Sequence, residues 1–418
     1  MFGAIDPGEI VGYVRSRPTG KFARRIWFFY EFLRGERLPL PDLRRGTYVD
    51  ALDPDACYTA SPRNVSRQRI RDSLPGDRRF CPTIRRTESL AAAERADLPA
   101  RCRAVLSTYP PGLLRRALSY LYTKETRSSF EIERIEPGSS RIERFVALLQ
   151  SAERDDFCTK ERLLELQNQI VDPRFRELEY RRVQNYVGET PGPLRERVHY
   201  VCPAPEHLPE LMDGLIDSHR RMGQGDVSAV AHAAAIAYGF VFLHPFEDGN
   251  GRIHRFLIHN ILARRGFTPE GIMFPVSAAM SKDRASYDAS LEAFSRPLLE
   301  IVDYTLDEAG RLEVPGDHSN WYRYIDFTAQ VEALYGFIRR TIETELVEEL
   351  AFLASYDRTK RAIQDVADVP DREIDRFISC CLENGGRLSK RKRGRFDFLS
   401  DEEVARMEAA VRESYDKG

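Results

Sequence analysis

The longest apolar stretch of the chain covers residues 227–243, where Ala, Val, Ile and Phe occupy every side of a helical projection. A helix that is apolar all round is buried, so this stretch predicts a helix at the centre of the fold. His244 and Pro245 end it, because a residue before proline disfavours helical backbone. A second helix is predicted from Gly249 to about Gly266, with an apolar face made by Ile253, Phe256, Leu257, Ile261 and Leu262.

Helical periodicity on both sides of this pair predicts a mainly α protein. The aromatic run from Trp27 to Leu33 lies in a helix expected to begin at Lys21, and we interpret the run as packed core. Residues 1–105 are otherwise rich in turns and are expected to be an N-terminal extension of unclear fold. Further helices are expected at residues 98–122, 142–169, 208–222, 282–294, 297–306 and 322–352.

A different pattern marks residues 336–418 as a separate domain. Helices are expected at 346–353, 359–366 and 371–382, followed by a hairpin around 390–394 and a last helix at 401–414. Three helices and a basic wing resemble a winged helix, which can contact DNA phosphates through its wing. Acidic residues beside the expected reading helix favour protein interaction or dimerisation over DNA binding: Glu373, Asp375 and Glu383.

Composition narrows the class of protein. The 418 residues carry a formal net charge of −2, which predicts no general attraction to nucleic acid or membranes. No apolar run reaches the roughly 20 residues of a membrane helix, and the N-terminus lacks the features of a signal peptide. The seven cysteines are scattered, without CxxC pairs or Cys/His clusters, so we expect reduced thiols, no structural zinc and a cytoplasmic location. The arginines between residues 63 and 86 alternate with acids and are typical of a solvated surface.

The loop between the two central helices combines several groups suited to phosphate chemistry. Two glycines allow close backbone approach at a helix N-terminus, where free N–H groups attract anions. Arg252 and Arg255 lie three residues apart, so both face one side of the first turn. His244 can accept a proton from a hydroxyl, and Asp248 can hold Mg²⁺ beside phosphates. Each residue alone has an ordinary structural explanation, but their combination within twelve residues favours phosphoryl chemistry.

This segment, His244-Pro-Phe-Glu-Asp-Gly-Asn-Gly-Arg-Ile-His-Arg255, resembles the signature of the Fic (Fic/Doc) family. The resemblance implies transfer of AMP from ATP to a Ser, Thr or Tyr hydroxyl of a target protein, with release of pyrophosphate. It implies that His244 is the general base and that Asp248 holds Mg²⁺. The remaining matched positions are implied to bind ATP: Gly249, Asn250, Gly251, Arg252 for the β-phosphate and Arg255 for the γ-phosphate.

Two further segments resemble accessory parts of the family. Ser129 and Glu133 fit the Ser-x-x-x-Glu core of an inhibitory helix, expected at about residues 123–136. The resemblance implies that Glu133 pairs with Arg255 and displaces the γ-phosphate, although Arg134 stands where the family usually has Gly or Asn. Alternating side chains around a Pro/Gly turn predict a β-hairpin at about 180–202, which resembles the flap that docks a target segment. Its docking residues would be Arg182, Gln184, Asn185, Tyr186, Val187 and Gly188.

We therefore expect a Fic core at residues 106–335 with a flap, an N-terminal extension and a winged-helix-like C-terminal domain. The expected activity is autoinhibited AMP transfer to a target protein, with self-modification and a homodimer as further expectations. Three alternatives stay open: removal of AMP from a modified target, transfer of another phosphate-containing group, and DNA-binding regulation through residues 336–418.

Overall fold

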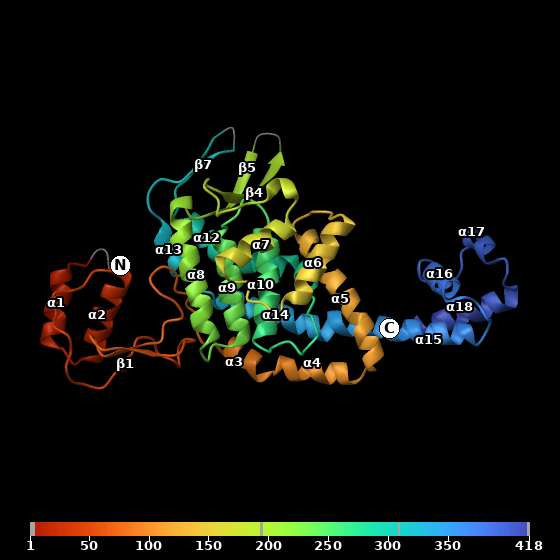
Figure 1. Cartoon of the computed structure of the whole chain (residues 1–418), viewed down its shortest axis with the longest axis horizontal. Coiled ribbons are helices and arrows are strands. Elements are labelled where there is room, and N and C mark those ends of the chain that lie inside the picture. The colour runs from red at the N-terminus through yellow and green to blue at the C-terminus, as the bar shows by residue number, and fades with distance from the viewer. Residues whose placement is uncertain (1–4, 193–194, 308–309, 416–418) are drawn as a thin grey trace. The chain divides into compact units, whose positions relative to one another are not determined.

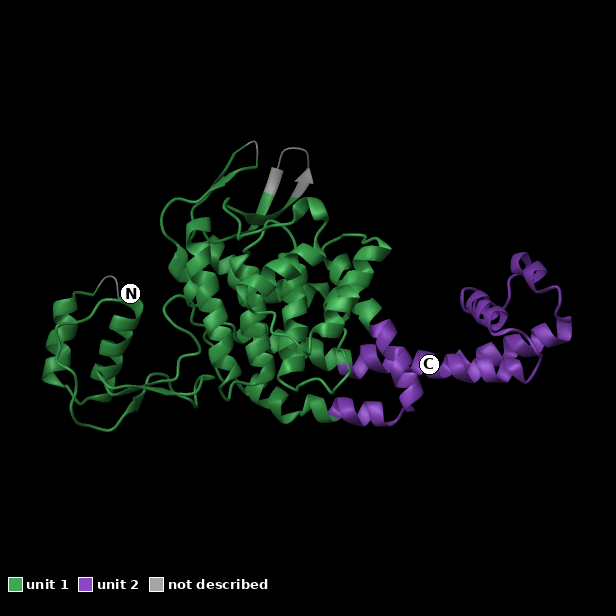
Figure 2. Cartoon of the chain, viewed as in Figure 1, with its two compact units in different colours: residues 1–100, 122–341 green, residues 101–121, 342–418 purple. Residues whose placement is uncertain are grey.

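The computed structural model describes residues 5–192, 195–307 and 310–415, and the side chains of residues 190–196 lie outside this description. The protein is mainly helical, as predicted, with three small sheets among the described residues (Figure 1). It divides into two compact units (Figure 2). The first contains residues 1–100 and 122–341, and the second contains residues 101–121 and 342–418. Among the described residues, no helix is both long and apolar enough to cross a membrane.

The predicted pair of central helices is present in the first unit. Helix α9 (Ala229–Leu243) begins at Ser228, whose hydroxyl accepts a hydrogen bond from the Ala231 N–H group. It packs against α8 (Leu208–Gly223) on one side and α10 (Asn250–Arg264) on the other (Figure 1). Nearly every side chain of α9 is buried, which explains why its sequence has no polar face. The loop 244–249 is consequently held between two rigid helices.

The remaining helices and strands of the first unit surround this pair. They are α1 (Pro7–Ser16), α2 (Lys21–Arg34), β1 (Val49–Asp50), β2 (Arg63–Val65), β3 (Ile70–Asp72), α3 (Glu88–Arg95), the last part of α5 (Pro111–Ile132), α6 (Ser139–Ser151), α7 (Lys160–Ile170), α11 (Val276–Lys282), α12 (Arg284–Leu299), β6 (Thr305–Leu306), β7 (Leu312–Glu313), α13 (Ser319–Arg323) and α14 (Thr328–Arg340). Short 3-10 turns lie at Pro173–Phe175 and Pro205–His207.

The N-terminal aromatic run belongs to a packed core, as predicted. In α2 the Trp27 side chain is 1% exposed, and its indole N–H donates to Glu31 at 2.7 Å. The same carboxylate binds the Arg67 guanidinium at 2.9 Å, and Arg67 stacks 4.9 Å above the indole ring. Arg71, another basic residue of this region, pairs with Asp50 and has a side chain that is 44% exposed. Arg71 thus lies on a solvated surface, as expected for the arginines of residues 63–86, whereas Arg67 is held in an ion pair at the edge of the core.

Residues 1–105 were expected to be an N-terminal extension of unclear fold, and residues 1–100 of this segment group with the central helices in one compact unit. Phe80 is fully buried, and its ring lies beside Gly239 of α9. A Cβ atom on Gly239 would lie 2.8 Å from both the Phe80 ring and the Leu215 side chain, so only glycine allows this close packing. The Cys81 N–H group also donates to the Arg323 carbonyl oxygen at 2.7 Å. Residues 80 and 81 therefore pack against the central part of the unit, whereas α1 and α2 form a small core of their own.

The predicted hairpin is present as β4 (Tyr186–Gly192) and β5 (Arg195–Val201), which pair antiparallel. Tyr186 lies opposite Val201, and the register shifts between Val187 and Gly188. The predicted turn at residues 190–193 falls partly outside the described residues. The segment just before β4 contacts the loop 244–249, since the Arg181 N–H group donates to the Pro245 carbonyl oxygen at 2.8 Å. The hairpin therefore begins beside the two central helices.

The second unit contains residues 101–107 of α4 (Leu98–Ser107), the start of α5, and the C-terminal helices. These are α15 (Leu346–Gln364), α16 (Asp371–Leu382), α17 (Lys390–Arg393) and α18 (Asp401–Tyr415), preceded by a π-helical turn at Thr341–Glu345 and with a 3-10 turn at Gly394–Phe396. Helices α16 and α18 agree with prediction. The expected break at residues 354–358 is absent, because Ser355, Tyr356 and Asp357 include no proline or glycine and α15 continues through them.

The predicted basic wing is wrong. Residues 390–396 form α17 and the 3-10 turn, and no strand is present in the described part of this unit. Gly385 and Gly386 both have positive φ and end α16, but the Lys and Arg residues that follow are good helix formers without strand-like alternation. Arg393 is held at the helix end by Asp401 at 2.8 Å, and Phe396 is fully buried. The DNA-binding alternative depended on a wing that the structure lacks.

Buried histidines near the centre predict a fall in stability at mildly acidic pH. Burial, and then the neighbouring His219, hold the pKa of His232 well below its ordinary value. Burial lowers the pKa of His254 to about 3. Below pH 6.5 the unfolded chain takes up protons that the folded chain cannot, so unfolding becomes easier. From pH 7 to pH 5 each of these histidines should lower the free energy of unfolding by about 2 kcal/mol.

Urea denaturation at pH 7, 6 and 5 would measure this fall. In the variant His254→Leu, the free energy of unfolding should fall between pH 7 and pH 5 by about 2 kcal/mol less than in the unmodified chain. A variant with the same pH dependence as the unmodified chain would contradict the assignment, whatever its stability at pH 7.

Candidate functional site

The loop between α9 and α10 is held by buried side chains. His244 adopts left-handed backbone with φ 50°, so the chain leaves α9 abruptly before Pro245. Phe246 is fully buried as the anchor of the loop. The Asn250 side chain accepts from the Phe246 N–H group at 3.1 Å and donates to the Phe246 carbonyl oxygen at 2.7 Å. Asn250 thus closes the loop with its buried side-chain amide.

His244 has the tautomer and the electrostatic surroundings of a base. Its Nδ1 atom lies 3.2 Å from the Val241 carbonyl oxygen, which places the proton on Nδ1 and leaves the Nε2 lone pair available. Burial, and after it the nearby Arg181 guanidinium, lower the pKa of His244 to about 4. The imidazole is therefore neutral at physiological pH and able to accept a proton.

An anion-binding N-terminus follows at α10. Gly249 has φ 93°, a backbone conformation that favours glycine, and it turns the first N–H groups of α10 out of the loop. A Cβ atom on Gly251 would lie only 2.5 Å from a carboxylate oxygen of Glu133. The Glu133 carboxylate therefore rests directly against the backbone at the helix N-terminus, where an anion is stabilised.

Glu133 pairs with both arginines of the loop. The predicted contact with Arg255 is present at 2.6 Å, and a second contact joins the other carboxylate oxygen to Arg252 Nε at 2.7 Å. The side chains of Arg252 and Arg255 are 0% and 2% exposed, so these are buried charge pairs. Ser129 accepts from Arg255 Nε through its hydroxyl at 2.8 Å and from Nη2 through its carbonyl at 2.6 Å. One carboxylate thus occupies both guanidinium groups.

The end of α5 explains how Glu133 reaches this position. The helix was expected to extend to about residue 136, but it ends at Ile132. Arg134 takes left-handed backbone with φ 57°, and the Ile135 N–H group bonds back to the Phe130 carbonyl oxygen. This is a helix C-terminal motif that favours Gly or Asn, the residues expected after the glutamate from the resemblance. Arg134 performs the same turn with an exposed side chain.

Asp248 lies on the rim of the loop and is 40% exposed. Its Oδ1 atom accepts from the Gly249 N–H group at 2.6 Å and from Arg252 Nη2 at 2.5 Å. Among the described residues, no cluster of three or more His, Cys, Asp or Glu side chains could hold a metal ion by itself. A single carboxylate is still compatible with Mg²⁺, which commonly binds one protein carboxylate together with substrate phosphates and water.

Sequence reasoning missed two groups that support the loop. Arg181, 3% exposed, donates from Nε to the His244 carbonyl oxygen and from Nη2 to the Pro203 carbonyl oxygen, both at 2.7 Å. Glu177 accepts from the Glu247 N–H group at 2.9 Å. Both residues act on backbone atoms, which leave no pattern in a sequence. The only sequence signal for Arg181 and Glu177 was their place in the chain, between a helix and the predicted hairpin.

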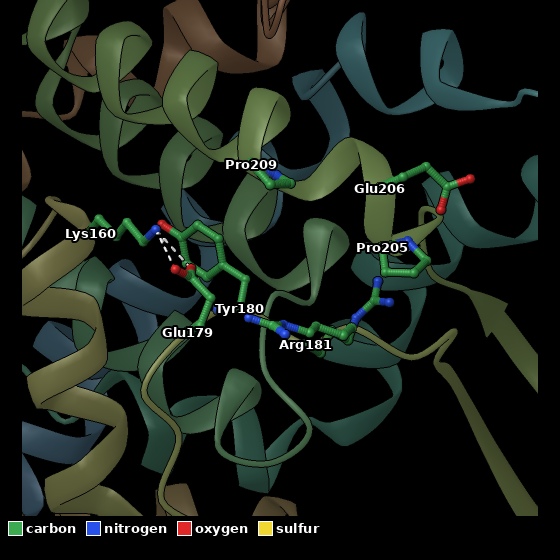
Figure 3. Close-up of a pocket in the computed structure, with 8 residues that line it drawn as sticks. Lys160, Glu179, Tyr180, Arg181, Pro205, Glu206 and Pro209 are labelled. Atoms are coloured by element: carbon green, nitrogen blue, oxygen red, sulfur yellow. Dashed lines mark hydrogen bonds and ion pairs between the residues drawn. The ribbon is translucent and has the colours of Figure 1, made fainter.

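Arg181 also lines a hollow of about 530 Å³ on the segment that leads into the hairpin (Figure 3). In this view Lys160 and Glu179 form an ion pair beside the Tyr180 ring, with a separation of 2.8 Å. None of the residues 244–255 lines the hollow, so it is separate from the loop. Its walls are made by Lys160, Glu179, Tyr180, Arg181, Arg182, Pro205, Glu206 and Pro209.

The predicted docking residues have two kinds of environment. Gln184 donates to the Cys202 carbonyl oxygen at 2.7 Å, and the Asn185 carbonyl oxygen accepts from the Cys202 N–H group at 3.1 Å, so both brace the base of the hairpin. The side chains of Arg182 and Val187 are exposed. Gly188 faces the Arg197 carbonyl oxygen so closely that a Cβ atom would lie 2.8 Å away. Tyr186 begins β4 and is half-buried.

Residues 157–262 match the family model for the Fic/DOC family. The chain contains a Fic domain. This Fic domain comprises α7, the hairpin, α8, α9 and most of α10, and therefore includes the loop described above. Glu133 and Ser129 lie outside the matched region.

Relatives with similarity to the Fic domain include three named protein adenylyltransferases. "Protein adenylyltransferase Fic" of Culex quinquefasciatus is 34% identical over 122 residues, or 28% of this chain and 22% of the relative. "Protein adenylyltransferase fic-1" of Caenorhabditis elegans is 33% identical over 103 residues, 24% of this chain and 19% of the relative. The Nematostella vectensis protein is 40% identical over 75 residues, 18% of each chain. The chain thus spans about a fifth of the length of these curated relatives.

A crystal structure of a Fic family protein from Desulfovibrio desulfuricans is also similar. It is 20% identical, with a TM-score of 0.41, over 66% of this chain and 80% of that chain.

Proposed function

We propose that this chain transfers AMP from ATP to a hydroxyl side chain of a target protein. The observation that carries the proposal is a neutral His244 with an available Nε2 atom beside two buried arginines and a helix N-terminus. The names of the relatives, which are protein adenylyltransferases, support the same activity.

In the proposed reaction the target hydroxyl oxygen attacks the α-phosphorus of ATP. His244 Nε2 takes the hydroxyl proton as the new P–O bond forms. The bond from the α-phosphorus to the bridging oxygen of the β-phosphate breaks, and pyrophosphate leaves. Arg181 positions the base by holding the carbonyl group of His244. The hydrogen bond to Val241 fixes the imidazole tautomer, so Nε2 is the accepting nitrogen before the substrate binds.

The phosphates would lie where the backbone of residues 249–251 meets the arginines. Arg252 would contact the β-phosphate and Arg255 the γ-phosphate, since planar guanidinium groups suit phosphate oxygens. Arg252 Nη1 is buried without a hydrogen-bonding partner among the described residues, which agrees with a group that meets a ligand. Asp248 would hold Mg²⁺, which would offset the charge that develops on the phosphates.

We also propose that Glu133 inhibits the enzyme. Its carboxylate lies against Gly251 and pairs with both arginines, so it competes with the terminal phosphates for the same positive groups. An ATP molecule bound beside it would lack a proper site for its γ-phosphate. The hairpin would bind a segment of the target as an added strand along β4 and present its hydroxyl to His244.

Incubation with Mg²⁺ and ATP labelled at either the α- or the γ-phosphate tests the transferred group. We expect label on protein from α-labelled ATP alone, at a low level in the unmodified chain. Label from the γ-position would instead mean phosphoryl transfer. Label from neither position, with a pre-modified target losing its AMP, would mean the reverse activity.

A further inference from the structure

The loop 244–249 is surrounded by more positive charge than Arg252 and Arg255, the two arginines of the motif, supply. Arg141, from α6, stacks 5.3 Å from the Phe130 ring, and Arg252 stacks on the same ring at 5.3 Å. Two guanidinium groups from helices more than 100 residues apart in sequence thus contact the same aromatic ring.

Arg141 is also connected to the start of α10 through the end of α7. Its Nη2 atom donates to the Ile170 carbonyl oxygen at 3.3 Å, at the last residue of α7. The next residue, Val171, packs against Gly249 so closely that a Cβ atom there would lie 3.1 Å from it. A short chain of contacts therefore leads from Arg141 to the glycine that opens α10.

The Arg141 guanidinium is incompletely used by the protein. Its Nε atom is buried and has no hydrogen-bonding partner in residues 5–192, 195–307 and 310–415. Burial, and then the neighbouring Arg252, lower the pKa of Arg141, whereas Asp248 acts in the opposite direction. Asp172 acts in the same direction as Asp248 and Arg144 in the same direction as Arg252, so charges of both signs surround this guanidinium group. The Nε–H group without a partner leaves a donor for an anionic acceptor, and a polyphosphate supplies one.

We propose that Arg141 is a third phosphate-binding arginine of this site and contacts the phosphates beyond the α-phosphate. The proposal rests on ATP being the donor, as proposed above. It adds a specificity-determining group from α6, outside the part of the chain that matches the Fic model. Arg141 would favour ligands with two or three phosphates over a nucleoside monophosphate, because only these place a phosphate away from the loop glycines.

The test is a binding titration of the full chain carrying Glu133→Gly, which frees the arginines. Into this background we would introduce Arg141→Met, which keeps the aliphatic packing on Phe130 but removes every donor. We expect the affinity for ATP and for pyrophosphate to fall about tenfold or more, as for loss of a charged hydrogen bond. Affinity for AMP should stay unchanged. Arg141→Lys, which keeps the charge, should restore part of the affinity for pyrophosphate.

Arg176→Met is the matched control. The Arg176 side chain is exposed and its Nε atom donates to the Asn168 carbonyl oxygen at 3.0 Å, so it also caps the end of α7. This variant should bind all three ligands normally. Equal losses for ATP, pyrophosphate and AMP in Arg141→Met, or no loss for any, would overturn the proposal. The pyrophosphate measurement keeps this test independent of AMP transfer: a chain that binds pyrophosphate through Arg141 but transfers no AMP would refute the proposed function alone.

Discussion

His244→Ala is expected to lower AMP transfer by about 10²–10⁴-fold, the contribution of a general base to such a reaction. Binding of ATP should remain, because the arginines and the α10 N-terminus are unchanged. Initial rates with α-labelled ATP and a separate equilibrium titration with ATP would measure the two effects. Retained transfer in this variant would show that another group takes the hydroxyl proton.

The pH dependence of the unmodified enzyme provides an independent check on the same histidine. Since the pKa of His244 is lowered to about 4, kcat/KM should stay level on the acidic side of neutrality and fall only as the pH drops through about 4. The fall follows because a protonated imidazole cannot accept the hydroxyl proton. His318→Ala is a suitable control: the ring of this half-buried residue donates to the nearby Pro315 carbonyl oxygen at 2.9 Å, and its removal should leave the profile unchanged.

Glu133→Gly is expected to raise AMP transfer, with self-modification as the simplest readout. Displacing the Glu133 carboxylate from two buried arginines costs the enzyme a few kcal/mol, and each 1.4 kcal/mol is a factor of ten, so an increase of about 10–100-fold is reasonable. The increase should appear in kcat together with a tighter productive complex with ATP, because Arg255 then becomes free for the γ-phosphate.

Two further variants separate inhibition from a change in folding. Glu133→Gln keeps the size and part of the hydrogen bonding but loses the charge, and should give an intermediate rate. Glu136→Gly changes an exposed glutamate three residues further on and should have no effect. A Glu133→Gly enzyme that is no faster than the unmodified chain would mean that the carboxylate is not inhibitory.

Several parts of this protein followed from short-range sequence patterns. The apolar stretch before His244 predicted α9, and the glycines after it predicted the start of α10, because backbone preferences and helical periodicity act within a few residues. The hairpin followed from alternation around a Pro/Gly turn. The pairing of Glu133 with Arg255 could be expected only because the family resemblance supplied a relationship between residues 122 positions apart.

Other features required the tertiary structure. The second contact of Glu133, to Arg252, depends on α5 ending at Ile132 and on the left-handed turn at Arg134. Arg181 and Glu177 bind backbone groups of the loop. Because every residue has the same backbone groups, no pattern of side chains in the sequence predicts these two contacts. The basic run at residues 390–393 formed a helix rather than a wing, because strands need pairing partners that a local sequence cannot provide.

The sequence by itself determined the candidate residues for the proposed chemistry: a base, a carboxylate, two glycines and two arginines at fixed spacing. The tertiary structure decided the burial, the tautomer and the charge pairing of these residues. It buried Arg252 and Arg255, set the tautomer of His244 through Val241, and brought Glu133, which follows α5, to the loop. It also placed Arg141 of α6 over the Phe130 ring. The physical reason is that spacing along a helix fixes which side chains share a face, whereas burial and charge pairing depend on elements that are distant in the chain and meet only when it folds.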